Sequence, residues 1–156
     1  MTAPFPLAPP AAKSGMDVHR FRGEYLDRFS AIETWVVERL LQTCAANAVP
    51  QMLGPRMEEL RKALAEHPDL VKNQVKVQSL LTALTPYQRL RGILAHACVH
   101  VAHEPEAGHV HIFQAPATSP DQAWQCRAVL RADELGPVLN RLKDIQNRLR
   151  QQTPDA

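Results

Sequence analysis

The sequence predicts an all-α protein, a bundle of four to five helices with a small β-hairpin inserted before the last helix. Apolar residues recur at a spacing near 3.6 over most of residues 21–103 and again over 135–149. Between these regions, GHVHIF (108–113) and WQCRAVL (124–130) alternate apolar and polar residues as strands do. A helical bundle with one local hairpin is therefore expected.

The domain organisation follows from length and composition. A chain of 156 residues with 45% apolar residues is long enough for one domain with its own core. Residues 1–16 are rich in proline and alanine, and proline lacks a backbone donor and favours extended chain. We therefore expect a disordered tail over 1–16 and a single helical domain over 17–152.

Cysteine content, hydropathy and charge limit the compartment and the partners that can be expected for the protein. Cys44, Cys98 and Cys126 are odd in number and far apart, which argues against a disulfide framework and favours a cytoplasmic location. No stretch approaches eighteen consecutive apolar residues, so no membrane span or membrane partner is expected. The net charge of +2 is too small to indicate a nucleic-acid partner by itself.

The first two helices are defined by an apolar face and by breakers. The first is expected from Phe21 to about Ala46, before the breaker run NAVPQMLGP, and the second over 57–67, where Pro68 stops it. The face of the first helix consists of Phe21, Tyr25, Phe29, Ile32, Val36 and Leu40. Trp35 and Trp124 are expected to be core or interface anchors.

The remaining helices are set by capping signals. A third helix is expected over about 69–84, and Thr85 with Pro86 and Gln88 predicts a new helix start, so that a fourth helix covers 86–103. The last helix has its apolar face on Leu135, Val138, Leu139, Leu142, Ile145 and Leu149. It begins either at Asp133 or at Gly136-Pro137.

The predicted helix over 86–103 carries the sequence RLRGILAHACVHVAH, which is rich in arginine and histidine. At helical spacing one face collects Arg89, His96, His100 and His103, while Arg91 flanks that face. Cys98 falls on the opposite side and is expected to be a small core residue. Gly92 and Ala95 predict a seam of small residues against a neighbouring helix or a second copy of the chain, with an inconsequential exposed glycine as the alternative.

Arginine and histidine together suit phosphodiester chemistry. A neutral imidazole accepts a proton and an imidazolium donates one near neutral pH, while a guanidinium stays charged and holds a phosphate through paired hydrogen bonds. RNA supplies its own nucleophile, the 2′-hydroxyl, so such a site needs neither metal nor cofactor. The alternative is that several surface histidines near a helix C-terminus merely interact with the helix dipole.

The segment Arg91-Gly-Ile-Leu-Ala-His96 resembles the Arg-x4-6-His motif of the HEPN superfamily, helical domains named for nucleotide binding in higher eukaryotes and prokaryotes. Counting from Arg89 gives the six-residue spacing that the motif also permits. The wording LRGILAH is similar to the family's frequent lRN-x-lAH. The layout is similar over about residues 20–150, so the resemblance implies an HEPN-like bundle.

The resemblance implies two functions and leaves them both open. Active members are metal-independent endoribonucleases, of toxin or defence type, whose arginine and histidine pairs converge across a homodimer. In that case His96 would be the general acid/base, Arg91 or Arg89 would hold the phosphate, and an antitoxin-like protein would be a partner. Other members are non-catalytic modules that bind RNA, a nucleotide or a protein, and Gly92, where the family often has a polar residue, keeps this alternative open.

Two further sites compete with this hypothesis. His96 and His100 at i,i+4, or His109 and His111 on one face of a strand, can hold a metal ion, but no HExxH sequence places a general base beside them, so no metal is predicted. The last helix has a basic face suited to a phosphate backbone, with Arg141 and Arg148 as binding candidates beside His100 and His103. More often such a face is solvated helix surface.

Overall fold

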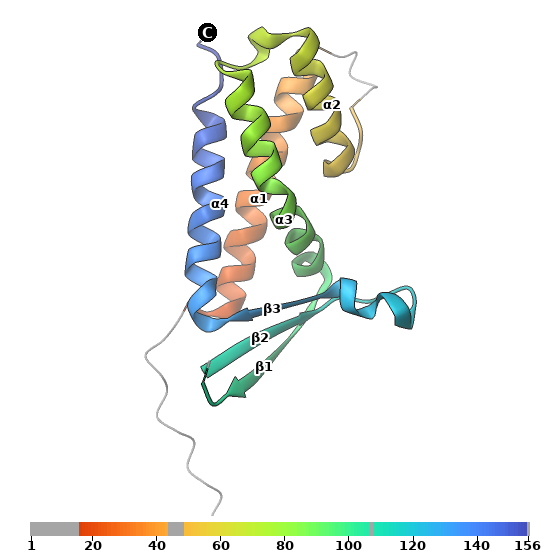
Figure 1. Cartoon of the computed structure of the whole chain (residues 1–156), viewed down its shortest axis with the longest axis vertical. Helices are drawn as coiled ribbons and strands as arrows, with labels where there is room; N and C mark the ends of the chain where they lie inside the picture. Colours follow the sequence, from red (N-terminus) through yellow and green to blue (C-terminus); the bar gives the residue numbers. More distant parts are fainter. Residues whose placement is uncertain (1–15, 44–48, 107, 156) are drawn as a thin grey trace, which may run out of the picture.

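The computed structural model describes residues 16–43, 49–106 and 108–155, and Figure 1 shows their arrangement. In these residues four helices form a bundle and three strands form an antiparallel sheet at one end of it, opposite to the C-terminus. The predicted class, a mainly helical bundle with a β element inserted before the last helix, is confirmed. The predicted tail lies outside the described residues except for Met16.

Helix α1 (Val18–Leu41) is the centre of the bundle and packs against the other three helices. It begins three residues before the predicted start because the Asp17 carboxylate caps it, accepting hydrogen bonds from the backbone N–H groups of His19 and Arg20, both at 2.9 Å. All six residues of its predicted apolar face are buried. Trp35 is buried as expected and its Nε1 donates to Thr153 Oγ1 at 3.0 Å, whereas the side chain of Trp124 lies outside what the structure describes.

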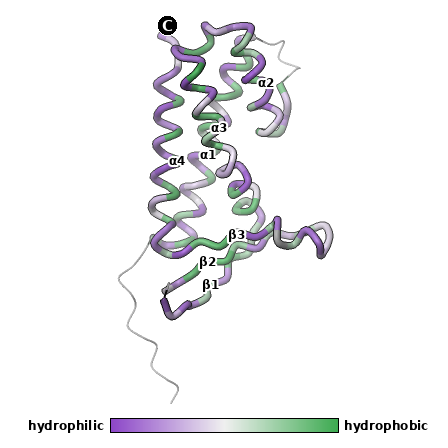
Figure 2. The backbone as a smooth tube through the Cα atoms, in the orientation of Figure 1, coloured by the Kyte–Doolittle hydropathy of each residue, from purple (hydrophilic) through white to green (hydrophobic). Residues whose placement is uncertain are grey.

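Helix α2 (Leu53–Glu66) begins earlier than predicted and stops before Pro68, as expected. Helix α4 (Leu135–Arg150) follows a short 3-10 helix (Ala132–Glu134) and begins between the two predicted starts, Asp133 and Gly136-Pro137. The predicted apolar face of α4 is buried except for the half-buried Val138. Figure 2 shows hydrophobic and hydrophilic residues alternating along α4, as a helix with one buried face requires.

The predicted helix boundary at Thr85 is wrong, because α3 is one continuous helix from Gln74 to His96 with Pro86 inside it. Its cap is Asn73, whose side chain accepts a hydrogen bond from the backbone N–H of Lys76 at 2.9 Å. A proline inside a helix costs about 3 kcal/mol because one backbone hydrogen bond is lost and the ring clashes with a carbonyl of the preceding turn. Buried apolar side chains on both sides of Pro86 offset that cost, namely Leu80, Leu81, Leu84, Ile93 and Leu94.

The second correction concerns residues 98–104, which form strand β1 (Cys98–Glu104) and not the end of a helix. The β-branched Val99 and Val101 stand at alternate positions here, which suits a strand. Strand β1 pairs along its whole length with β2 (Gly108–Gln114). His100 and His103 therefore do not lie on the predicted helical face. Cys98 is exposed, so its predicted place in the core is also wrong.

The sheet order is β1-β2-β3, with β3 at Arg127–Arg131. The predicted pairing of the two regions is confirmed, but residues 124–126 belong to a 3-10 helix (Pro120–Cys126), so β3 begins later than expected. Cross-strand partners share a face. The inner face contains Phe113, whose ring centre lies 6.4 Å from that of Phe21 on α1, and the outer face contains Ile112 and the exposed Val129.

None of the helices in the described ranges is both long enough and apolar enough to cross a membrane.

Candidate functional site

Arg89 and His96, two of the predicted site residues, line one cavity of about 390 Å³ at the C-terminal end of α3. Two turns of helix separate them, which is about 10.5 Å along the axis. Both side chains are exposed to solvent. The remaining walls are Gly92, Ile93, Ala115, Pro116, Gln125 and Cys126. The cavity is therefore mainly apolar, with one cationic and one titratable group at its rim.

The far wall of this cavity is held in place by hydrogen bonds to backbone carbonyls. The N–H of Ala115, just after β2, donates to the carbonyl of Cys126 at 2.8 Å. Gln114 Nε2 donates to the carbonyls of Ala115 at 3.1 Å and Ala123 at 3.3 Å. The 3-10 helix between β2 and β3 is thus fixed against the sheet end and presents Gln125 and Cys126 to α3.

Arg89 contacts this wall directly. Its Nη2 donates to the carbonyl of Gln125 at 3.5 Å, a long and solvent-exposed hydrogen bond. Such a contact orients the guanidinium but leaves most of its donors free for an anion, since arginine carries five N–H groups. Gln125 was not predicted as a site residue, and no local sequence signal points to it.

His96 is the last residue of α3, and Arg22 on α1 fixes the backbone there. The Arg22 guanidinium donates to the carbonyl of Ala97 at 3.0 Å and to that of Ala95 at 3.4 Å. These hydrogen bonds satisfy carbonyls at the helix end and place a positive charge at the negative end of the helix dipole. The position of His96 therefore depends on a residue of the first helix.

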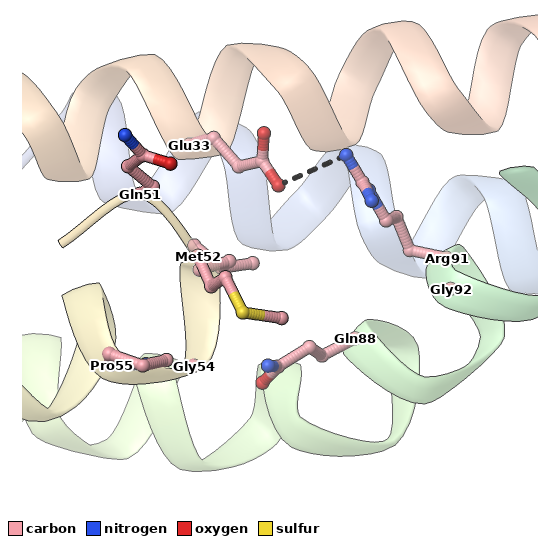
Figure 3. A pocket seen from close by; sticks show the side chains of 9 residues that line it. Glu33, Gln51, Met52, Gly54, Pro55, Gln88, Arg91 and Gly92 are labelled. Carbon is pink, nitrogen blue, oxygen red and sulfur yellow. Dashed lines mark ion pairs between the residues drawn. The ribbon is translucent and has the colours of Figure 1, made fainter.

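Arg91 lies in a different cavity of about 340 Å³, between α1, α2 and α3 (Figure 3). Its Nη2 is 3.6 Å from Glu33 Oε1, and Glu33 is mostly buried. Gln88 and Met52 line the same cavity. Of the two arginines that the motif permits, Arg89 shares a cavity with His96 and Arg91 does not.

Gly92, one of the two residues of the predicted seam, has no close neighbour among the residues that the structure describes. Gly92 is exposed, and a Cβ added to it would meet nothing within 4 Å. Close approach of one of the described helices is therefore not the reason for this glycine. Gly92 instead lies on the rim of both cavities.

The other predicted binding residues lie away from the Arg89–His96 cavity. His100 and His103 are on opposite faces of β1, since three positions along a strand change the face. Arg141 and Arg148 are on α4, and Arg148 Nη1 is 3.6 Å from Asp144 Oδ2. The structure does not bring these four side chains together with His96.

Strand β1 changes the geometry of one of the two histidine pairs that the sequence offers as metal ligands. His96 and His100 no longer stand one turn apart on a helix. His109 and His111 share the inner face of β2, as expected, but His109 is exposed and His111 is buried. Burial and the nearby His109 lower the pKa of His111, and Asp17 partly opposes this. No group of three or more metal-binding side chains lies within the described residues.

Comparison of the chain with protein-family models, with curated proteins and with solved structures finds no match.

Proposed function

We propose that the protein is RNA-directed and that the Arg89–His96 cavity binds and cleaves an RNA phosphodiester without a metal. One observation carries this proposal: Arg89 and His96 line the same cavity, at the spacing that the HEPN-type motif permits. The guanidinium is the group suited to hold a phosphate, and the imidazole is the group suited to move a proton at neutral pH.

The reaction at such a site proceeds within the RNA itself. Neutral His96 takes the proton of a ribose 2′-hydroxyl, and the 2′-oxygen attacks the adjacent phosphorus. The bond from phosphorus to the 5′-oxygen breaks, and this oxygen leaves with a proton from solvent. The products are a 2′,3′-cyclic phosphate and a 5′-hydroxyl end. Arg89 stabilises the negative charge on the phosphoryl oxygens as it develops.

The apolar part of the cavity gives the proposal a second support. Ile93, Ala115 and Pro116 form a wall beside the two polar residues. An unstacked base of single-stranded RNA presents an apolar face that such a wall accepts, and single-stranded RNA is the form in which bases are free to do so. The proposed substrate is therefore a single-stranded or looped segment.

The biological setting that we propose is cytoplasmic, as a ribonuclease of toxin or defence type with an antitoxin-like protein partner. A homodimer is part of this proposal, because in HEPN-type ribonucleases the arginine and histidine pairs converge across two chains. Exposed Gly92, at the rim of the cavity, gives a second copy access to the α3 backbone at this point.

Cleavage of structured RNA in excess chelator tests the proposal. Wild type is expected to cleave and to leave 2′,3′-cyclic phosphate ends, whereas His96→Ala is expected to be inactive. An RNA with a single 2′-deoxy substitution at the cleaved position is the matched substrate control and should resist. Cleavage that chelator abolishes, or that survives His96→Ala, would contradict the proposal.

The alternative is a non-catalytic module that binds a protein or nucleotide partner. It is favoured by the outer face of the sheet, where Val129 is 52% exposed next to Ile112 and opposite the helices. If folded wild type does not cleave RNA and its RNA binding does not depend on Arg89, the result would support the non-catalytic module.

A further inference from the structure

The β1–β2 hairpin places two exposed imidazoles directly opposite each other. His103 on β1 pairs in register with His109 on β2, and both side chains lie on the inner face of the sheet, beyond the part that the helices cover. Their ring centres are 5.3 Å apart, with the ring planes at 64°. This pair lies in neither of the cavities that hold Arg89 and Arg91.

The spacing of the rings matches a shared metal ion. A zinc–nitrogen bond of about 2.0–2.1 Å puts the ion about 3.2 Å from the centre of a ring, and a tetrahedral angle then separates two ring centres by about 5.2 Å. The observed distance of 5.3 Å between the ring centres agrees with that separation. Antiparallel pairing fixes the two backbones, so little backbone freedom is lost on binding.

The surroundings of the pair are compatible with a cation. The flanking row of the inner face contains Val101 and His111, and the buried Nδ1 atom of His111 has no hydrogen-bond partner in the part of the chain that the structure describes. The charged residue nearest along β1 is Glu104, an acid, which adds no repulsion to a cation. Because the described residues contain no group of three metal-binding side chains, water must complete the coordination.

We propose that His103 and His109 form a two-imidazole site for a divalent transition metal of the zinc, nickel or copper class. Imidazole is a ligand that these ions prefer, whereas magnesium and calcium prefer oxygen. The bound ion joins β1, an edge strand of the sheet, to the central strand β2. The proposal is independent of the RNA-directed function, which needs no metal.

Isothermal titration of the tag-free full chain with Zn²⁺, and separately with Ni²⁺, tests this site. One equivalent of metal is expected to bind to wild type. Since loss of a residue that merely supports a ligand weakens metal affinity about 10–100-fold, His103→Ala or His109→Ala is expected to weaken binding by at least about tenfold. Copper-loaded protein should also show the electron-paramagnetic signature of two coordinated nitrogens.

His100→Ala is the matched control. His100 is exposed on the same strand but lies on the outer face, opposite Ile112, so its removal should leave the affinity unchanged. Circular dichroism of each variant checks that the exposed substitutions preserve the fold. Failure of wild type to bind one equivalent, or equal affinity in wild type and His103→Ala, would overturn the proposal. Loss of binding in His100→Ala alone would do the same.

Discussion

Arg89 and His96 lie two turns apart on α3 and line one cavity between that helix and the segments that flank the sheet. Arg91 is only two residues from Arg89, but a helix rotates by about 200° over two residues, so its side chain points to another side of α3. There it meets Glu33 on α1. Two arginines that the sequence motif does not distinguish are thus separated by the fold.

Arg22 is predicted to position His96 without contacting the RNA. Arg22→Ala removes the hydrogen bonds to the carbonyls of Ala95 and Ala97, and hydrogen bonds from a charged group contribute about 1.5–3 kcal/mol. The free energy of unfolding, measured by urea denaturation, should fall by about that amount, with less loss in Arg22→Lys. If Arg22→Ala kept the wild-type midpoint, the end of α3 would not depend on this residue.

Gly92→Ala is predicted to stabilise the monomer. A glycine inside a helix costs about 1 kcal/mol relative to alanine, and the added Cβ meets nothing within 4 Å, so the free energy of unfolding should rise by about that amount. Gly92→Leu extends the side chain further and serves as the test of association. A drop in molar mass by light scattering in Gly92→Leu would place this position in a dimer interface, and an unchanged mass would remove it from one.

Asp17 is predicted to make the start of α1 sensitive to acid. Hydrogen bonds from the backbone N–H of Arg20 and then of His19 hold the pKa of the Asp17 carboxyl below its usual 3.8. A lowered pKa in the folded state means that the stabilisation is complete above about pH 4 and is lost as the pH falls through the folded-state value. Asp17→Asn, which caps without a charge, should lose this part of the pH dependence, while Asp17→Ala should be less stable at neutral pH. Equal acid sensitivity in wild type and Asp17→Asn would contradict this.

Phe113 is predicted to hold the sheet against the bundle. It is fully buried on the inner face and packs against Phe21, and truncating a buried phenylalanine costs about 3–5 kcal/mol. Phe113→Ala should therefore lower the free energy of unfolding by about that amount, and Phe113→Leu, which keeps most of the volume, by less. A loss below 1 kcal/mol in Phe113→Ala would mean that the sheet is not coupled to the bundle core.

The sequence correctly predicts the helices that bury one apolar face, and the structure confirms these parts of the prediction. In α1 and α4 the buried apolar residues repeat only at the helical spacing, so the sequence of each segment fits a helix and no other structure. The segment from Thr85 to His103 is different, because its local signals fit more than one structure. Thr85 with Pro86 resembles a helix start, and the buried residues on both sides of Pro86 decide instead for one helix.

For the same reason, the candidate site can be predicted only in part from the sequence. His96, His100 and His103 fit a helical spacing, but the valines between them also fit a strand, and pairing with β2 decides for the strand. The choice between Arg89 and Arg91 depends on Glu33 and Gln125, which lie far away in the sequence. Contacts of this kind are tertiary and leave no local pattern.

A double-mutant cycle on RNA cleavage in excess chelator tests the shared role of Arg89 and His96 most directly. Residues that act as one catalytic unit are strongly non-additive, so Arg89→Ala, His96→Ala and the double variant should lose activity to a similar extent. Arg91→Ala is the matched control and should cleave at nearly the wild-type rate. Full activity in Arg89→Ala, with loss of activity in Arg91→Ala, would contradict the account.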